Sequence, residues 1–178
     1  MKQVLLVIDM QKDFIDGALG TKEAEAVVPA VLAKIRAYDI ADVFVTMDLH
    51  EEDYLDTQEG KFLPVRHCIR GTEGQQMPSE LEEALRGATV FEKGGFGSVE
   101  LMQKLTELSG QEELSIEIVG LCTDVCVVTH ALMMKAAMPS VPVSVDASCC
   151  AGITPEGHRD AIATMRACQI IIKEGESA

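Results

Sequence analysis

The segment Ser115-Ile-Glu-Ile-Val-Gly-Leu-Cys-Thr-Asp-Val-Cys-Val-Val128 decides the fold of this chain. Polar and apolar side chains alternate over residues 115–119, which predicts a buried strand, and Gly120 ends that pattern. A helical pattern rich in Ala, Leu and Met follows over residues 125–138. Cys126 is therefore expected near the N-terminus of a helix, where unpaired N–H groups and the helix dipole favour an anion. We expect its thiol to ionise readily, and a thiolate is a nucleophile.

Length and composition indicate an ordinary globular chain. At 178 residues, with 47% apolar and 25% charged residues, it is expected to form one domain, residues 1–178. Its net charge of −14 argues against nucleic acid and membrane surfaces as partners, because proteins that bind those anionic surfaces are usually basic. The apolar run before Asp9 is too short for a signal peptide or a membrane span, so we expect a cytoplasmic protein with six free cysteines.

Strand and helix patterns alternate along the whole chain. The expected strands are residues 3–9, 41–47, 89–92, 115–119, 141–145 and 169–172. The expected helices are residues 22–38, 78–86, 99–108, 125–138 and about twelve residues from Thr154. This alternation predicts an α/β fold, a three-layer αβα arrangement with a six-stranded parallel sheet of Rossmann-like type. Sites in such sheets form beyond the carboxyl ends of the strands.

Chemically useful side chains stand at those strand ends. Asp9, Lys93 and Cys126 follow or close the first, third and fourth expected strands, so they are expected to converge at one edge of the sheet. A thiol nucleophile needs a base for its proton and a cation beside the thiolate. An aspartate and a lysine can supply these two functions, so the three residues form a candidate catalytic group.

Three blocks of sequence carry a resemblance to a known family: Val7-Ile-Asp-Met-Gln-Lys-Asp-Phe14, Phe91-Glu-Lys-Gly94 and Gly120-Leu-Cys-Thr-Asp-Val-Cys-Val127. In order and spacing they resemble the isochorismatase-like cysteine hydrolases, the superfamily that includes nicotinamidases. The resemblance implies a catalytic triad of Asp9, Lys93 and Cys126. It also implies a non-proline cis peptide bond before Cys122, and an oxyanion hole formed by the backbone N–H groups of Cys122 and Cys126.

The activity implied by the resemblance is hydrolysis of a small carboxamide, such as nicotinamide, to an acid and ammonia through a thioester. The substrate is expected to be an aromatic heterocycle. We expect Phe14, Tyr54 and Leu121 to line its pocket. The family often presents a tryptophan before the histidine-bearing turn, whereas this chain has no tryptophan and carries Leu63-Pro64 there.

The long polar segment of residues 49–76 is a candidate metal site. Two imidazoles and several carboxylates suit a divalent transition metal such as zinc, iron or manganese, although an acidic, solvated loop with two incidental histidines has the same composition. The resemblance favours a metal, most readily zinc, because nicotinamidases carry Asp-x-His and a later His at this place. The ligands it implies are Asp48, His50, His67 and one carboxylate, for which Glu59 is our choice and Asp56 or Asp53 the alternatives.

Two other functions remain open from the sequence. One is a metal-free isochorismatase-like hydrolase that acts on another amide, a ureide or an enol ether. The other is a catalytically inert α/β binding module with a redox-active set of cysteines. His130, four residues after Cys126 on the expected helix, is interpreted as structural, because the Asp9–Lys93 pair already provides a base and a cation. Relatives usually self-associate, so we expect a homo-oligomer.

Overall fold

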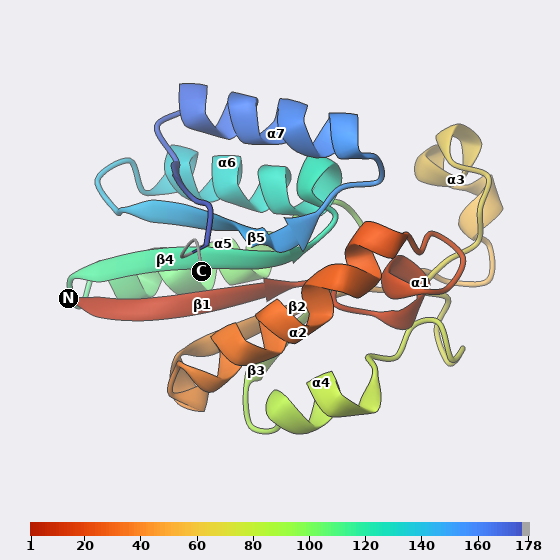
Figure 1. The fold of residues 1–178 in the computed structure, drawn as a ribbon, viewed down its shortest axis with the longest axis horizontal. Coiled ribbons are helices and arrows are strands. Elements are labelled where there is room, and N and C mark those ends of the chain that lie inside the picture. Colours follow the sequence, from red (N-terminus) through yellow and green to blue (C-terminus); the bar gives the residue numbers. More distant parts are fainter. Residues whose placement is uncertain (176–178) are drawn as a thin grey trace.

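A six-stranded parallel sheet runs through the computed structural model, which describes residues 1–175 (Figure 1). Its strands are β1 (Lys2–Ile8), β2 (Val43–Asp48), β3 (Thr89–Lys93), β4 (Leu114–Leu121), β5 (Val143–Ala151) and β6 (Ile171–Lys173). They lie in the order β3-β2-β1-β4-β5-β6, and every neighbouring pair is parallel. The predicted fold class is therefore confirmed.

Helices cover both faces of the sheet (Figure 1). One face carries α2 (Lys22–Arg36) and α4 (Ser79–Ala84), and the other carries α5 (Val99–Ser109), α6 (Val128–Ala137) and α7 (Pro155–Ala167). The five consecutive residues from Val4 to Ile8 in β1 are each fully buried, because alternate side chains point into the two separate apolar cores. This burial explains why β1 is a continuous apolar run.

Between β1 and β3 the chain also contains four short elements, in addition to α2, β2 and α4. They are α1 (Lys12–Ile15), α3 (Gln58–Phe62) and two 3₁₀ turns, Ile40–Asp42 and Tyr54–Asp56. In Figure 1 α3 stands away from the layered body, beyond the carboxyl ends of the strands. The segment of residues 49–76, read as a loop from the sequence, thus contains two helical pieces.

The helix starts follow from capping chemistry. The Ser98 hydroxyl accepts a hydrogen bond from the N–H of Leu101 at the start of α5, and the Thr154 hydroxyl accepts one from Gly157 at the start of α7. Pro155 occupies the first turn of α7, where a missing N–H carries no cost. Both starts agree with the sequence prediction.

The strand order reverses between β1 and β4. From β1 the chain adds β2 and then β3 on one side, and it returns to place β4 against the other side of β1. A gap between loops opens at such a reversal, beyond the carboxyl ends of the strands. Asp9 follows β1 directly and Cys126 lies in the connection after β4, so both residues border this position.

The structure corrects the region around the opening segment. β4 does not end before Gly120 but continues through it to Leu121, with a register shift against β5. The expected helix of residues 125–138 begins only at Val128, because a π-helical turn, Thr123–Val127, precedes it. Cys126 therefore lies inside a widened turn, between strand and helix.

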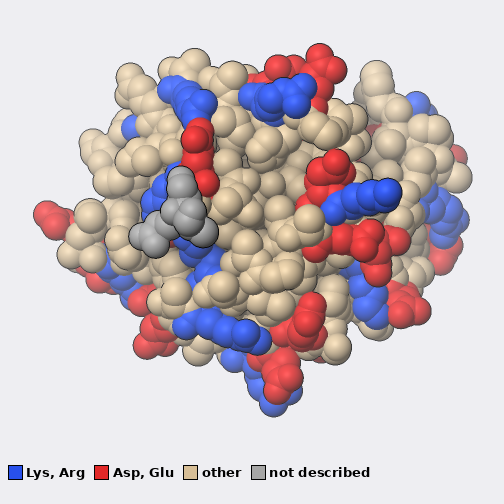
Figure 2. Space-filling view, viewed as in Figure 1, with Lys and Arg blue, Asp and Glu red and all other residues tan. Residues whose placement is uncertain are grey.

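Charged side chains are dispersed on the face of the molecule seen in Figure 2, where lysines and arginines alternate with aspartates and glutamates. Within residues 1–175, no helix combines the length and the apolar character that a membrane span requires.

Replacing Gly120 by alanine is expected to destabilise the protein by about 3 kcal/mol or more. Gly120 has a φ of +118°, and a Cβ there would lie 2.2 Å from the carbonyl oxygen of Ile8 in β1. The change must therefore separate the two strands that border the switch point. Gly95→Ala is the matched control, because a Cβ at Gly95 meets nothing within 4 Å.

Urea unfolding of both variants measures the effect. The control is expected to stay within about 0.5 kcal/mol of the parent protein. Equal stabilities for the two variants would show that β1 and β4 do not need this close approach.

Candidate active site

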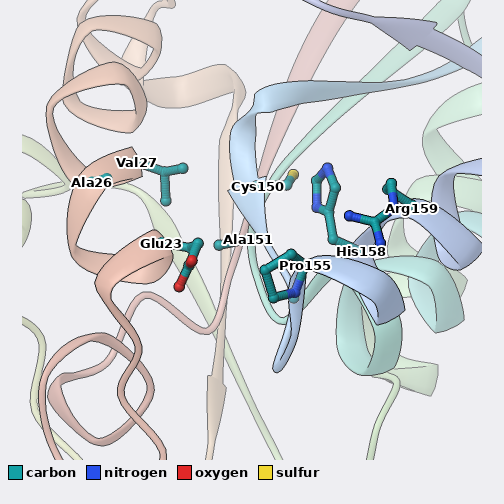
Figure 3. A pocket seen from close by; sticks show the side chains of 9 residues that line it. Glu23, Ala26, Val27, Cys150, Ala151, Pro155, His158 and Arg159 are labelled. Carbon is teal, nitrogen blue, oxygen red and sulfur yellow. The ribbon is translucent and has the colours of Figure 1, made fainter.

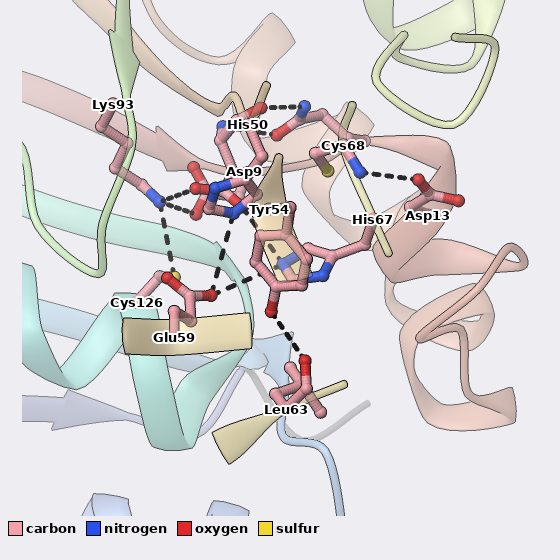
Figure 4. A network of polar contacts seen from close by, with 12 residues as sticks. Asp9, Asp13, His50, Tyr54, Glu59, Leu63, His67, Cys68, Lys93 and Cys126 are labelled. Atoms are coloured by element: carbon pink, nitrogen blue, oxygen red, sulfur yellow. Dashed lines mark hydrogen bonds and ion pairs between the residues drawn. The ribbon is translucent and has the colours of Figure 1, made fainter. Parts of the chain in front are cut away.

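Asp9, Lys93 and Cys126 meet at the carboxyl edge of the sheet (Figure 4). The Lys93 Nζ atom lies 2.7 Å from Asp9 Oδ2 and 3.6 Å from Cys126 Sγ. The three residues come from the end of β1, the last position of β3 and the turn after β4. All three are buried, with at most 6% of each residue exposed. The structure therefore brings together the three residues that the sequence proposed.

The two oxygens of the Asp9 carboxylate have different surroundings. The Thr46 hydroxyl donates a hydrogen bond of 2.6 Å to Asp9 Oδ1. Asp9 Oδ2 forms an ion pair of 2.7 Å with the Lys93 ammonium and makes no other polar contact in the described residues. The backbone of Asp9 has a φ of +49°, a conformation that is uncommon outside glycine and concentrates at functional sites. Oδ2 can therefore accept a proton.

The environment of Cys126 keeps its proton in place. Burial raises the pKa of the Cys126 thiol well above its usual value, and the negative charge of Asp9 raises it further, while Lys93 acts in the opposite direction. This direction runs against the expectation of a readily ionised thiol, because burial opposes the effect of the nearby helix start. The thiol proton then needs an acceptor close by, and Asp9, whose carboxylate acts on the pKa of Cys126, is the candidate.

Lys93 remains charged in this setting. Burial lowers the pKa of its ammonium, but the nearby charges of Asp9, Cys126 and Asp48 raise it to well above its ordinary value. The ammonium also lies 3.2 Å from Asp48 Oδ1, at the end of β2. One buried ammonium group thus contacts two carboxylates and a sulfur atom.

The turn that carries Cys126 is organised by the carbonyl of Cys122. This carbonyl accepts hydrogen bonds of 3.1 Å from the N–H groups of Val125 and Val127. The peptide bond between Leu121 and Cys122 is cis, as the resemblance implied.

A second polar cluster adjoins the first. Asp48, His50 and His67 each offer one ligand atom, and these atoms lie within 4.8 Å of one another. Asp48 Oδ2 is 2.8 Å from His50 Nε2 and 3.4 Å from His67 Nε2. Glu59 Oε1, on α3, lies 3.8 Å and 3.7 Å from the same two nitrogens. The alternative carboxylates Asp53 and Asp56 are exposed to solvent instead.

The donor atoms of this cluster fit a divalent metal. The His67 Nδ1–H group donates a hydrogen bond of 2.8 Å to the Val65 carbonyl, which leaves the Nε2 lone pair pointing into the cluster. His50 Nε2 is buried and has no hydrogen-bond partner, although Asp48 is close to it. Buried nitrogens and carboxylate oxygens that face one another without good hydrogen bonds are the pattern expected of a metal-ligand set.

Two adjoining cavities lead to these groups. The inner one, about 40 Å³, is lined by both clusters, with Cys126, Cys122, Asp48 and His67 among its walls. The outer one, about 700 Å³, opens over α3 and the glycine-rich loop after Lys93. Both cavities share four walls: Glu59, Leu63, Phe96 and Val125. A small ligand can therefore contact the thiol and the candidate metal ligands together.

Of the three expected pocket residues, only Phe14 lies on the wall of the inner cavity, where its ring packs at 5.5 Å against the ring of His67. Tyr54 and Leu121 do not meet the expectation that they line the pocket, because both are fully buried and line neither cavity. Tyr54 packs behind the imidazoles of His50 and His67, and its hydroxyl donates to the Leu63 carbonyl. Tyr54 thus supports the candidate metal-ligand cluster from behind.

A further cavity, of about 360 Å³, lies between α2 and α7 (Figure 3). Its walls include Glu23, Cys150 and Arg159, and they are mostly apolar. None of the seven residues assigned to catalysis or metal binding lines it. This cavity does not belong to the candidate active site.

The sequence did not assign roles to Gln11 or Asp13, although both lie in the first resembling block. The Gln11 side chain is fully buried; it donates to the carbonyls of Asp48 and Gln75 and accepts from the Asp48 N–H. Asp13 accepts a hydrogen bond of 2.8 Å from the N–H of Cys68, next to His67. Gln11 thus positions the backbone of the candidate ligand Asp48, and Asp13 positions the residue that follows the candidate ligand His67. The available signal was a polar side chain shortly after a buried strand.

Comparisons with known proteins agree with this geometry. The sequence profile of the isochorismatase domain family matches residues 3–176. No significant match is found among curated protein sequences.

Similar solved structures are enzymes of one kind. The pyrazinamidase of Pyrococcus horikoshii in complex with zinc is 26% identical, with a TM-score of 0.79, and the match covers 98% of this chain and 100% of that one. A nicotinamidase/pyrazinamidase of Bacillus subtilis is 24% identical with a TM-score of 0.84 and the same coverage. The yeast nicotinamidase bound to the inhibitor nicotinaldehyde is 18% identical, with a TM-score of 0.80 and again 98% and 100% coverage.

Replacing Gln11 by alanine is expected to destabilise the protein by about 3 kcal/mol, because it leaves the buried N–H and carbonyl of Asp48 without partners. Gln103→Ala, on the exposed face of α5, is the control and is expected to change stability by less than about 0.5 kcal/mol. Chemical denaturation measures both. A Gln11→Ala variant as stable as the control would contradict the positioning role.

Proposed function

Because the chain belongs to the isochorismatase domain family, we propose that it is a cysteine amidohydrolase of the nicotinamidase type. Its substrate is a small carboxamide, and an aromatic heterocycle such as nicotinamide fits best. One observation carries the proposal: the Cys126 thiol lines the same inner cavity as three candidate metal ligands, Asp48, Glu59 and His67. The Lys93 ammonium pairs with both Asp9 and Asp48, which joins the two groups. The nicotinamidase and pyrazinamidase structures to which this chain is similar support it.

Catalysis begins with proton transfer from Cys126 to Asp9. Asp9 Oδ2, which has no hydrogen bond of its own, takes the thiol proton, and the Lys93 ammonium 3.6 Å from the sulfur holds the resulting thiolate. The proton moves within the group and is not released to solvent, so the raised pKa of the thiol does not prevent the step. The sulfur atom then attacks the carbonyl carbon of the substrate.

The tetrahedral intermediate requires donors for its oxyanion. We assign this role to the backbone N–H groups of Cys122 and Cys126, each contributing about 3 kcal/mol to stabilising the transition state. Asp9 returns its proton to the amide nitrogen as the C–N bond breaks. Ammonia leaves, and the acyl group remains on the Cys126 sulfur as a thioester.

Water completes the cycle on the same residues. Asp9 takes a proton from a water molecule, and the hydroxide attacks the thioester carbonyl. The C–S bond breaks, the acid leaves, and the thiolate recovers its proton from Asp9. Each proton that Asp9 accepts is therefore returned within one turnover, and Lys93 stays charged throughout.

The residues that would hold the metal are Asp48, His50, His67 and Glu59. When bound, the metal supplies a Lewis acid for a lone pair of the substrate ring. Zinc suits two imidazoles and two carboxylates, and iron or manganese suits the same set. The zinc-bound pyrazinamidase among the similar structures supports zinc for this chain.

We also propose that the chain is one domain, residues 1–178, which works in the cytoplasm as a homo-oligomer. The single sheet that contains all six described strands supports one domain, although residues 176–178 lie outside the described part. The six free cysteines suit a reducing compartment.

Cys126→Ala is expected to abolish ammonia release from nicotinamide, and Asp9→Asn to lower it by about 1,000-fold, as for the loss of a general base. The readout is ammonia release by purified protein, with circular dichroism to verify folding. Cys168→Ala is the control, since Cys168 is exposed and far along the chain from the triad. A folded Cys126→Ala variant with near-normal turnover would rule out the assigned nucleophile.

Removal of the metal by a chelator is expected to stop turnover, and one equivalent of zinc to restore it. His67→Ala is expected to weaken zinc binding by about 100-fold or more, because it removes a ligand. His158→Ala is the control: that imidazole pairs with Thr123 outside the cluster. Calorimetric titration with zinc compares them.

Two results would contradict the metal assignment. One is equal zinc affinity in both histidine variants. The other is turnover that neither chelator nor zinc affects, which would favour a metal-free hydrolase acting on another amide, a ureide or an enol ether.

A further inference from the structure

The sheet by itself does not fix how close Lys93 lies to Cys126. Lys93 ends β3, whereas Cys126 follows β4, and two strands, β2 and β1, lie between them. Their loops must therefore be joined by contacts outside the strand ladder. The 3.6 Å separation between Nζ and Sγ depends on those contacts.

His130, on α6, makes such a contact. Its Nε2 atom accepts a hydrogen bond of 3.0 Å from the N–H of Ser98, the cap of α5. Its Nδ1 atom lies 2.7 Å from the carbonyl oxygen of Cys126. The side chain is fully buried. Because Nε2 accepts, the proton of the neutral ring must be on Nδ1, and the ring donates to the Cys126 carbonyl.

The tautomer of His130 thus joins two chain segments through one ring. Burial lowers the pKa of His130, which keeps the ring neutral and able to accept at Nε2. The Ser98 N–H belongs to the start of a helix, where no intrahelical acceptor is available, and the residue is buried. Without His130 this donor would lose its partner.

The two hydrogen bonds of His130, to the Ser98 N–H and the Cys126 carbonyl, form what we call the His130 bridge. The packing beside this bridge is equally close. A Cβ on Gly97 would lie 2.3 Å from Met133 Sδ and 3.0 Å from Thr129 Cγ2, both on α6. The end of the glycine-rich loop that begins after Lys93 therefore rests directly on the helix that continues from the Cys126 turn.

We propose that His130 is a positioning residue that holds the loop after Lys93 against the turn that carries Cys126. The role rests on the proposed function, since it sets the geometry of the Lys93–Cys126 pair for amide cleavage. His130 touches neither the substrate cavity nor the Lys93 ammonium, and it acts through the backbone of Ser98 and Cys126. The positioning role extends the structural interpretation of His130 that the sequence suggested.

Two amide substitutions separate the halves of the bridge. His130→Asn places a donor near the Nδ1 position and keeps the bond to Cys126, but loses the acceptor for Ser98. His130→Gln places an acceptor near the Nε2 position and keeps the bond to Ser98, but loses the donor. His130→Leu removes both. Tyr38→Phe is the control, because it deletes a partly buried hydrogen bond to Glu117, in the middle of β4.

The first readout is steady-state turnover of nicotinamide by the metal-loaded protein. His130→Leu is expected to lower kcat by roughly 100-fold, as for a misplacement near 1 Å, with KM changed by less than about threefold. The two amide variants are expected to fall between His130→Leu and the parent protein. Tyr38→Phe is expected to lose stability but retain its kcat.

The second readout does not depend on activity. Amide hydrogen exchange at Ser98 is expected to become at least about tenfold faster in His130→Leu and His130→Asn, because the donor loses its acceptor, and to stay slow in His130→Gln. In the parent protein, nitrogen NMR of the ring is expected to show the Nδ1–H tautomer. That measurement tests the two hydrogen bonds of His130 even when a variant fails to fold.

The outcomes are distinct. Folded variants with faster Ser98 exchange but kcat within twofold of the parent would overturn the positioning role, and so would an Nε2–H tautomer in the parent. A parent protein that binds zinc but releases no ammonia from any carboxamide would instead overturn the proposed function, and the positioning role with it.

Discussion

The buried ammonium of Lys93 is the charge on which the site depends. It lies 2.7 Å from Asp9 and 3.2 Å from Asp48, two carboxylates that are themselves almost fully buried. Removing one partner from such a group leaves an uncompensated buried charge and costs about 3–5 kcal/mol. Lys93 therefore stabilises the candidate base Asp9 and the candidate metal ligand Asp48 at the same place. Its contact with Cys126 then adds the cation that a thiolate needs.

This arrangement follows from the topology of the sheet. Parallel strands deliver the ends of β1, β2 and β3 to one edge, so that an aspartate, a second aspartate and a lysine lie within reach of one another. The turn after β4 brings Cys126 to the same edge from the other side of the reversal. The strand ladder fixes the first three positions, whereas the fourth depends on the π-helical turn, the hydrogen bonds to the Cys122 carbonyl and the His130 bridge.

The sequence predicted the parts that depend on strand ends. Asp9, Lys93 and Cys126 could be proposed because parallel strands converge, and the Asp-x-His frame directed attention to the second cluster. The state of the thiol could not be predicted, because burial among apolar side chains opposes the effect of the helix start, and burial is a property of packing. Tyr54 was misplaced for a similar reason: an aromatic residue near two histidines can face a ligand or support the imidazoles from behind, and only packing distinguishes these.

Trapping the acyl intermediate tests the account most directly. Metal-loaded protein mixed with nicotinamide, quenched in acid within the first turnovers and mapped by peptide mass spectrometry, is predicted to carry the acyl group of the substrate on Cys126. The label should be absent from the other five cysteines, Cys122 included. Turnover with an unmodified Cys126, or an acyl group on a different residue, would contradict the central claim that the thiol held between Asp9 and Lys93 is the nucleophile.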